Sequence, residues 1–366
     1  MPVLAFLVGV AYFPGIPSAA SMPRWWVLAL GLPLASRLDL RALGPFALTL
    51  LAATLAWAFA ASFFGSPHPH AAALEWDFLA LLCLVAVAAA GLDDLGPTIE
   101  ALAWGVAASA LLCVPQALGW SPVPLSGGKA AGLFINSEVM AETAAPLVAW
   151  AASSRRWPLA AVLALPLALC GSRLAPAAAA AGLLWAWRPR RAWVRPALVL
   201  TLAAAAAASL VLLKVESGGQ RVVLWVAAAY SITPLGRGLG WWAAAHPGPF
   251  EEFVHSDLLQ AMVELGAGAA PLAAFFAAAL WRTTDAGPRA ALAAAYLEAV
   301  VSFPLHVPCA GFLVFALAGY ALRRRARVRG AGPRGGADAR ARYGRAGAHC
   351  GGVDRGVGRG RSALPL

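Results

Sequence analysis

Three side chains in this sequence have the chemistry to act together on an anionic substrate: Arg173, Arg221 and His255. The guanidinium group of arginine is a planar, permanently charged fork that matches a phosphate or diphosphate. Histidine is the side chain best able to accept a proton near neutral pH. Two arginines and one histidine that meet could hold a diphosphate leaving group and activate the hydroxyl group of an acceptor.

Further polar side chains accompany these three. His255 opens a predicted helix in which Gln260 and Glu264 lie one turn apart, so a polar strip runs down from the preceding loop. Asp257 falls in the first turn of that helix, where a carboxylate interacts favourably with the helix dipole. The other polar candidates along the chain are Glu138, Glu142 and His306.

Each candidate also has a plain structural interpretation. Arg173 could cap a break between two helices, and Arg221 could anchor a helix at the membrane interface. His255 could cap its helix or extend toward water, and Asp257 could serve the helix dipole alone. Taken together, the residue types favour chemistry on an anionic substrate.

The predicted chemistry requires neither a metal nor another cofactor. The pair Asp93 and Asp94 is typical of a solvated turn, and His68 and His70 have no further clustered ligands around them. The five cysteines share no metal-ligand or disulfide spacing. We therefore predict a site without a metal.

The composition shows which solvent the chain is made for. Of its 366 residues 61% are hydrophobic and only 12% are charged, with a mean hydropathy of +0.71. Soluble domains carry about 25% charged residues, so a cytosolic enzyme, a disordered scaffold and a nucleic-acid-binding domain are excluded. Because helices satisfy their own backbone hydrogen bonds in lipid, we expect an all-α integral membrane protein.

Apolar stretches along the chain predict about twelve transmembrane helices. A spanning helix needs about 20 apolar residues. Segments 25–36 and 157–187 could instead be re-entrant or broken helices. The expected segments are 3–20, 25–36, 45–64, 74–91, 98–118, 134–152, 157–171, 174–187, 194–213, 258–281, 288–305 and 307–322.

Basic residues predict the orientation, since cytoplasmic loops are enriched in lysine and arginine. With the N-terminus inside, the inner loops hold ten basic residues. The outer loops hold six, namely Arg24, Lys129, Arg173, Lys214, Arg221 and Arg237. Residues 1–322 then form a polytopic membrane domain, with one larger outer loop at 214–256. Residues 323–366 contain 12 arginines and form a basic cytoplasmic tail that we expect to be disordered.

Ordered motifs between residues 132 and 322 resemble the O-antigen ligase and polymerase superfamily of bacterial envelope glycosyltransferases. The motifs are Gly132–Asn136, Gly171–Arg173, Arg221 with Trp225 and Pro234–Gly240, His255–Gly266 and Ser302–Pro308. Each motif is short, and their common order makes the set fairly specific. The tail has no counterpart in the superfamily.

The resemblance implies metal-independent transfer of a glycan from undecaprenyl diphosphate to a hydroxyl acceptor, for which lipid A-core is one candidate. His255 would be the base or would orient the acceptor, and Arg173 and Arg221 would hold the diphosphate. The supporting residues would be Asn136, Asp257, Glu264 and His306. The resemblance also implies a multi-pass protein of the bacterial inner (plasma) membrane, in contact with membrane lipid, with its site facing the periplasm.

Departures from the superfamily pattern leave the acceptor open. Ser256 stands where the superfamily often has asparagine, and Leu258 where an aromatic residue is common. Ligases, polymerases and protein O-glycosyltransferases share the motifs. A flippase or transporter of lipid-linked oligosaccharide is the alternative from another class, and an inactive paralogue is a third.

Overall fold

The computed structural model describes residues 1–13, 21–36, 38–186, 215–246 and 254–324. Within these ranges every regular element is a helix, and the β-type pairing consists of an isolated bridge between Leu43 and Arg323. The all-α expectation is confirmed for this part of the chain. Of the predicted basic tail, 323–366, residues 325–366 lie outside the described residues, as does the expected span 194–213.

The described helices fall into two groups along the chain. The first group is α1 (Pro2–Val10), α2 (Ser21–Ala35), α3 (Pro45–Ala60) with its π-helical end η1 (Ala61–Gly65), α4 (Pro69–Ala90), α5 (Gly96–Leu111) and α6 (Cys113–Ala117). The second is α7 (Ser137–Ser153), α8 (Trp157–Leu169), α9 (Leu174–Ala186), α11 (Val215–Ser231), α12 (Trp241–Ala245), α13 (Asp257–Leu265), α14 (Ala269–Arg282), α15 (Ala286–Val301) and α16 (Pro308–Ala321). Short 3₁₀ turns are η2 (Ser126–Gly128), η3 (Gly132–Phe134), η4 (Gly266–Gly268) and η5 (Pro304–His306).

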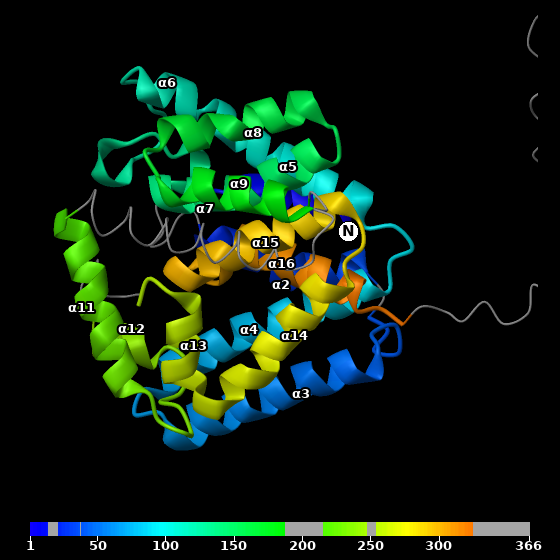
Figure 1. The fold of residues 1–366 in the computed structure, drawn as a ribbon, viewed down its shortest axis with the longest axis vertical. Coiled ribbons are helices and arrows are strands. Elements are labelled where there is room, and N and C mark those ends of the chain that lie inside the picture. The colour runs from blue at the N-terminus through cyan, green and yellow to red at the C-terminus, as the bar shows by residue number, and fades with distance from the viewer. Residues whose placement is uncertain (14–20, 37, 187–214, 247–253, 325–366) are drawn as a thin grey trace, which may run out of the picture. The chain divides into compact units, whose positions relative to one another are not determined.

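Helices α15 and α16 lie between two groups of helices. Helix α15 packs on α7 and α9, whereas α16 packs on α4 and α14 (Figure 1). Small residues allow the backbones to approach: a Cβ on Gly182 would come 2.3 Å from the carbonyl oxygen of Ala290, and one on Gly319 2.0 Å from that of Ala86. Close crossings at small residues are typical of helices packed in membranes.

Four helical stretches in the described residues are long and apolar enough to cross a membrane: Pro45–Gly65, Pro69–Ala90, Gly96–Ala117 and Asp257–Arg282. Shorter apolar helices are Trp157–Leu169, Leu174–Ala186 and Pro308–Ala321. The expected count of about twelve spans is therefore not confirmed. Several predicted spans correspond to helices with similar bounds, but some of these helices, such as α8 and α9, are shorter than the roughly 20 residues that a spanning helix needs.

Two expected irregular segments differ in outcome. Residues 157–187 are broken at Gly171–Arg173, where α8 ends and α9 begins. Residues 25–36 instead belong to α2, a continuous helix of 15 residues that accommodates Pro33. The larger outer loop predicted at 214–256 contains two helices, α11 and α12, so much of it is regular structure.

Arg24, which the sequence places in an outer loop, lies inside α2 and is 1% exposed. Its Nε donates to the carbonyl oxygen of Val8 at 3.0 Å, and its guanidinium carbon lies 3.9 Å from the ring centroid of Phe134. The outer-loop assignment of Arg24 is corrected: a buried arginine joins α2 to the end of α1 and to η3.

Candidate active site

Helix α13 carries the polar strip and is held at both ends. At its start the Ser256 hydroxyl accepts a hydrogen bond from the backbone N–H of Leu259 at 3.2 Å. This N-cap satisfies one of the donors that a helix leaves unpaired. At its end, the backbone N–H groups of Arg237 and Gly238 donate to the carbonyl oxygens of Val263 and Glu264, each at 2.9 Å.

Glycines allow the loop 234–240 to dock against the end of α13. Gly236 has φ +82° and Gly266 has φ +55°, conformations that glycine adopts without strain. A Cβ on Gly236 would lie 2.3 Å from the carbonyl oxygen of Glu264. The glycine-rich motif therefore positions α13 and the side chain of Glu264, whose Oε1 accepts from the backbone N–H of Trp242 at 3.3 Å.

Arg221 extends from α11 into the interior and is 6% exposed. Its guanidinium group donates to the carbonyl oxygen of Val301 at 3.2 Å and to Glu138 Oε2 at 3.1 Å. A guanidinium group has five N–H donors, and these contacts use two of them. The remaining donors have no partner in the described part of the chain, so the group retains capacity for an anion.

His255 does not open α13 as predicted but precedes its N-cap, Ser256, and is 7% exposed. Its backbone has φ +55°, a conformation uncommon for residues other than glycine. The indole Nε1 of Trp225 donates to its carbonyl oxygen at 3.3 Å, and its imidazole packs at 5.3 Å against the ring of Phe303. Unusual backbone conformations of this kind cluster at functional sites.

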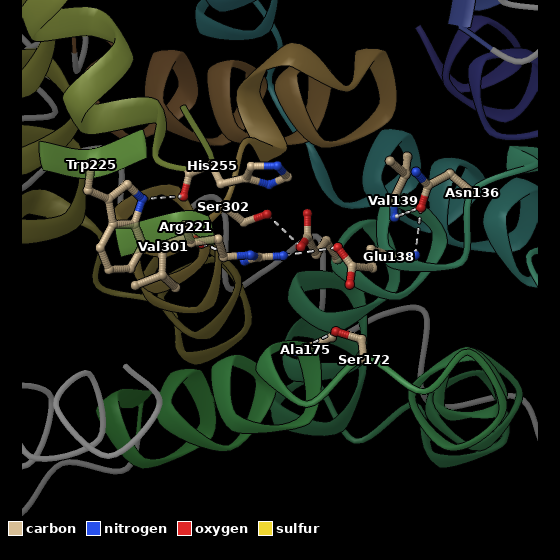
Figure 2. A network of polar contacts seen from close by, with 11 residues as sticks. Asn136, Glu138, Val139, Ser172, Ala175, Arg221, Trp225, His255, Val301 and Ser302 are labelled. Carbon is tan, nitrogen blue, oxygen red and sulfur yellow. Dashed lines mark hydrogen bonds and ion pairs between the residues drawn. The ribbon is translucent and has the colours of Figure 1, made fainter. Parts of the chain in front are cut away.

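The short segment Val301–Phe303 contacts both of these residues, and Figure 2 shows Val301 and Ser302 beside Arg221 and His255. Val301 accepts from Arg221, and Phe303 contacts His255. Between them, Ser302 accepts from the backbone N–H of Asp257 at 2.8 Å and donates its hydroxyl to Glu142 Oε1 at 2.6 Å. The end of α15 therefore holds Arg221 and His255 at a common place.

Asn136 influences Arg221 indirectly, through Glu138. Its side chain caps α7 by accepting from the backbone N–H groups of Glu138 and Val139 at 2.9 and 3.4 Å. The preceding residue, Ile135, has φ +66°, which is an outlier for a β-branched residue. This turn aims Glu138 at Arg221 (Figure 2).

A second polar group lies along α13. His306 Nδ1 lies 2.7 Å from Asp257 Oδ1, and the amide Nε2 of Gln260 lies 3.3 Å from both His306 Nε2 and Glu264 Oε1. Burial lowers the pKa of His306, but the hydrogen bond and the charge of Asp257 raise it by more. The resulting pKa is about 9. The amide N–H of Gln260 opposes this effect because it favours a neutral ring.

Arg173 is exposed in the turn between α8 and α9. Its neighbour Ser172 appears in the same close-up as Arg221 (Figure 2), and its hydroxyl accepts from the backbone N–H of Ala175 at 3.4 Å. Within the described ranges no contact joins Arg173 to Arg221 or to His255. The meeting of the two arginines stays a prediction.

The structure thus brings together His255, Arg221, Asn136, Asp257, Glu264 and His306 in two adjoining networks. Glu75 and Ser302 enter them without having been singled out as site residues. Glu75 could have been suspected, because an ionisable residue near the start of an apolar segment marks functional sites in membranes. No protein-family model matches this chain, and no curated protein matches its sequence.

Proposed function

We propose that this protein is a membrane glycosyltransferase that moves a glycan from undecaprenyl diphosphate to a hydroxyl acceptor, in the manner of an O-antigen ligase. One observation supports this function above the others. A buried arginine with donors to spare and a histidine in a strained backbone conformation contact the same segment, Val301–Phe303.

In the proposed reaction the acceptor oxygen attacks the anomeric carbon of the glycan. The bond from that carbon to the carrier diphosphate breaks, and its electron pair leaves on the diphosphate. Arg221 stabilises the negative charge that develops there, because a guanidinium group matches phosphate oxygens in a fixed geometry. The acceptor proton passes to the imidazole of His255, or His255 orients the hydroxyl group while the departing diphosphate takes the proton.

Glu138 has a defined part in this scheme. Its carboxylate contacts Arg221 at 3.1 Å and holds the guanidinium group in position to bind the diphosphate. A diphosphate carries more charge and more acceptor oxygens than one carboxylate, so it competes for the donors of Arg221. Arg173, exposed in the turn before α9, would add a second contact to the carrier.

The proposal also covers the location. The protein would lie in a bacterial inner (plasma) membrane with His255 on the periplasmic side, where lipid-linked glycans and their acceptors meet. The superfamily motifs leave three acceptors for the test: lipid A-core, a growing polymer and a protein hydroxyl group.

The test uses the full chain in lipid nanodiscs with a lipid-diphosphate-linked glycan and each acceptor in turn. Formation of a glycosylated acceptor with stoichiometric release of the carrier diphosphate supports transfer, and the His255→Ala variant is the control. In a parallel liposome assay, bilayer crossing of the intact lipid-linked glycan without cleavage would identify a flippase and overturn the proposal.

A further inference from the structure

A cavity of about 320 Å³ lies between α13, α4 and α2. Its volume falls at the lower end of the range for small-molecule sites, which begins at about 300 Å³. One face of α13 lines it with Asp257, Gln260 and Glu264, spaced by three and four residues as one side of a helix requires. His306 closes the same side. Neither His255 nor Arg221 lines this cavity.

The polar side of the cavity is rigidly built. Asp257, Gln260 and Glu264 are between 3% and 5% exposed, and hydrogen bonds of 2.7 to 3.3 Å connect them through His306. The backbone N–H of Val254 donates to Gln260 Oε1 at 3.3 Å, which fixes the orientation of the amide. Such a network presents carboxylate and amide groups in a constant arrangement.

The wall formed by α2 and α4 is mainly aromatic and aliphatic, with Glu75 as its one carboxylate among the lining residues. The rings of Trp25 on α2 and Phe78 on α4 stack with centroids 4.4 Å apart and planes 6° from parallel. Leu79, Leu82 and Phe315 extend this apolar surface. A molecule in the cavity therefore meets hydrogen-bonding groups on one side and aromatic and aliphatic carbon on the other.

A sugar ring has this two-sided character. Its hydroxyl groups donate to carboxylate and amide oxygens, while its axial C–H groups present an apolar face that packs on aromatic rings. The charge of the side chains that line the cavity also restricts which sugars can bind. Glu75, Asp257 and Glu264 face a single basic side chain, His306, and neither lysine nor arginine lines the cavity. Like charges in a desolvated site repel strongly, so a carboxylate or phosphate on the ligand is disfavoured.

We propose that this cavity binds one uncharged sugar ring and excludes sugars that carry a carboxylate or phosphate. The backbone N–H of Asp257 donates to the carbonyl oxygen of Ser302, so the cavity shares a wall with the Arg221 and His255 site. Under the proposed function, the ring belongs to the acceptor glycan. This assignment to the acceptor is the only part of the inference that rests on the proposed function. The cavity is thereby the element that selects acceptors by charge.

The binding test uses the full chain in lipid nanodiscs, free of sugar-based detergent. The probe is an alkyl glucoside with a photoreactive diazirine in its chain, and the matched probe is the corresponding glucuronide. We expect the glucoside to label peptides that contain Trp25, Phe78 or Ala261. We expect at least about tenfold less labelling by the glucuronide, since like-charge contacts cost several kcal/mol.

Two pairs of variants sharpen the result. Ala261→Leu fills the cavity from α13 and should abolish glucoside labelling, whereas Ala273→Leu, at an exposed position on α14, should not. Replacing both Glu75 and Glu264 by glutamine should raise glucuronide labelling toward that of the glucoside. Asp94→Asn, which removes one carboxylate outside the cavity, should leave the preference unchanged.

Equal labelling by the two probes, or labelling confined to peptides outside the cavity, overturns the proposal. Glucoside labelling that persists in a folded Ala261→Leu variant does the same, and its folding is checked by thermal melting. Because binding is measured without transfer, the outcome is separate from that of the proposed function. Selective binding of uncharged sugars by a protein that transfers no glycan would support the binding site. That result would contradict only the assignment of the sugar to the acceptor.

Discussion

Arg221 and Glu138 lie 83 residues apart in the sequence, yet their side chains meet at 3.1 Å. The arginine side chain is 8% exposed and the carboxylate 33% exposed. A charged pair of this kind adds little to the stability of the folded protein, because the cost of taking the charges out of water offsets their attraction. Stability alone therefore does not account for the pair, and the proposed function gives Arg221 an anion to bind.

The arginine is tested by two substitutions at the same position. Lysine keeps the charge of Arg221 but lacks the fork that can contact two phosphate oxygens. Arg221→Lys should therefore reduce glycan transfer, and Arg221→Ala should reduce it by about 10²-fold or more, as for the loss of a group that stabilises developing charge. Transfer is measured as released carrier diphosphate. Wild-type rates for both variants would make Arg221 an interfacial anchor.

The glycine-rich loop 234–240 is tested through stability. A Cβ at Gly236 meets backbone at 2.3 Å and forces a left-handed residue, so Gly236→Ala should destabilise the protein by about 2 kcal/mol or more. Gly219→Ala is the control, because it lies within α11 with no atom near the added methyl group. Thermal melting followed by tryptophan fluorescence should show a lower Tm for the first variant only.

The orientation in the membrane is tested with two serines on opposite predicted sides. Ser126 and Ser154 are both exposed in the structure, in the loops before and after α7. In a chain whose native cysteines are replaced, an impermeant thiol reagent should label Ser126→Cys in intact cells but not Ser154→Cys. The reverse pattern would place His255 on the cytoplasmic side and exclude the periplasmic reaction.

The pair of His306 and Asp257 predicts a dependence of stability on pH. Burial lowers the pKa of His306, and Asp257, with Glu75 and Glu264 adding charge, raises it to about 9 from the ordinary value of 6.5. Because the raised pKa favours the protonated folded state, this stabilisation is complete below about pH 6.5 and is lost as the pH rises through 9. Asp257→Asn removes the main cause of the raised pKa, so the fall in Tm between about pH 6.5 and 9 should be smaller in this variant.

The sequence predicted an all-helical chain with helices apolar enough to span a membrane, because both properties follow from local composition, whereas its count of about twelve spans is not confirmed. It also predicted the polar strip on α13, since residues one turn apart on a helix are neighbours. Gln260 and Glu264 indeed join in one network. The break at Gly171–Arg173 could also be predicted from local sequence, because glycine and proline change the backbone locally.

The rest depended on contacts that no local pattern reveals. Arg24 looked like a loop residue because it lies near the start of an apolar run, but its partners Val8 and Phe134 come from other segments. Glu75 reaches the cavity only because α4 packs beside α2 and lines the same cavity as α13. Helix ends were misplaced where caps and turns consume apolar residues, and hydropathy does not distinguish these from the helix itself.

The last prediction concerns His255, the residue most directly tied to the reaction. A sugar hydroxyl group is a weak nucleophile at neutral pH, and a positioned base contributes about 10²- to 10⁴-fold to the rate. His255→Ala should therefore reduce transfer by that factor. Because His255 has φ +55°, replacement also costs some stability, so the Tm and the binding of the carrier diphosphate are measured alongside.

A second substitution separates the two roles that His255 could have. Glutamine retains hydrogen bonding without basicity, so His255→Gln should be as slow as the alanine variant if the imidazole accepts the proton. Near-normal rates for glutamine would instead identify an orienting group, with the proton passing to the departing diphosphate. Near-normal rates for alanine in a folded protein would remove His255 from the chemistry. His306, which lies with Asp257 on the adjoining network, would then be the next histidine to replace, because the same topology puts it on the outer side.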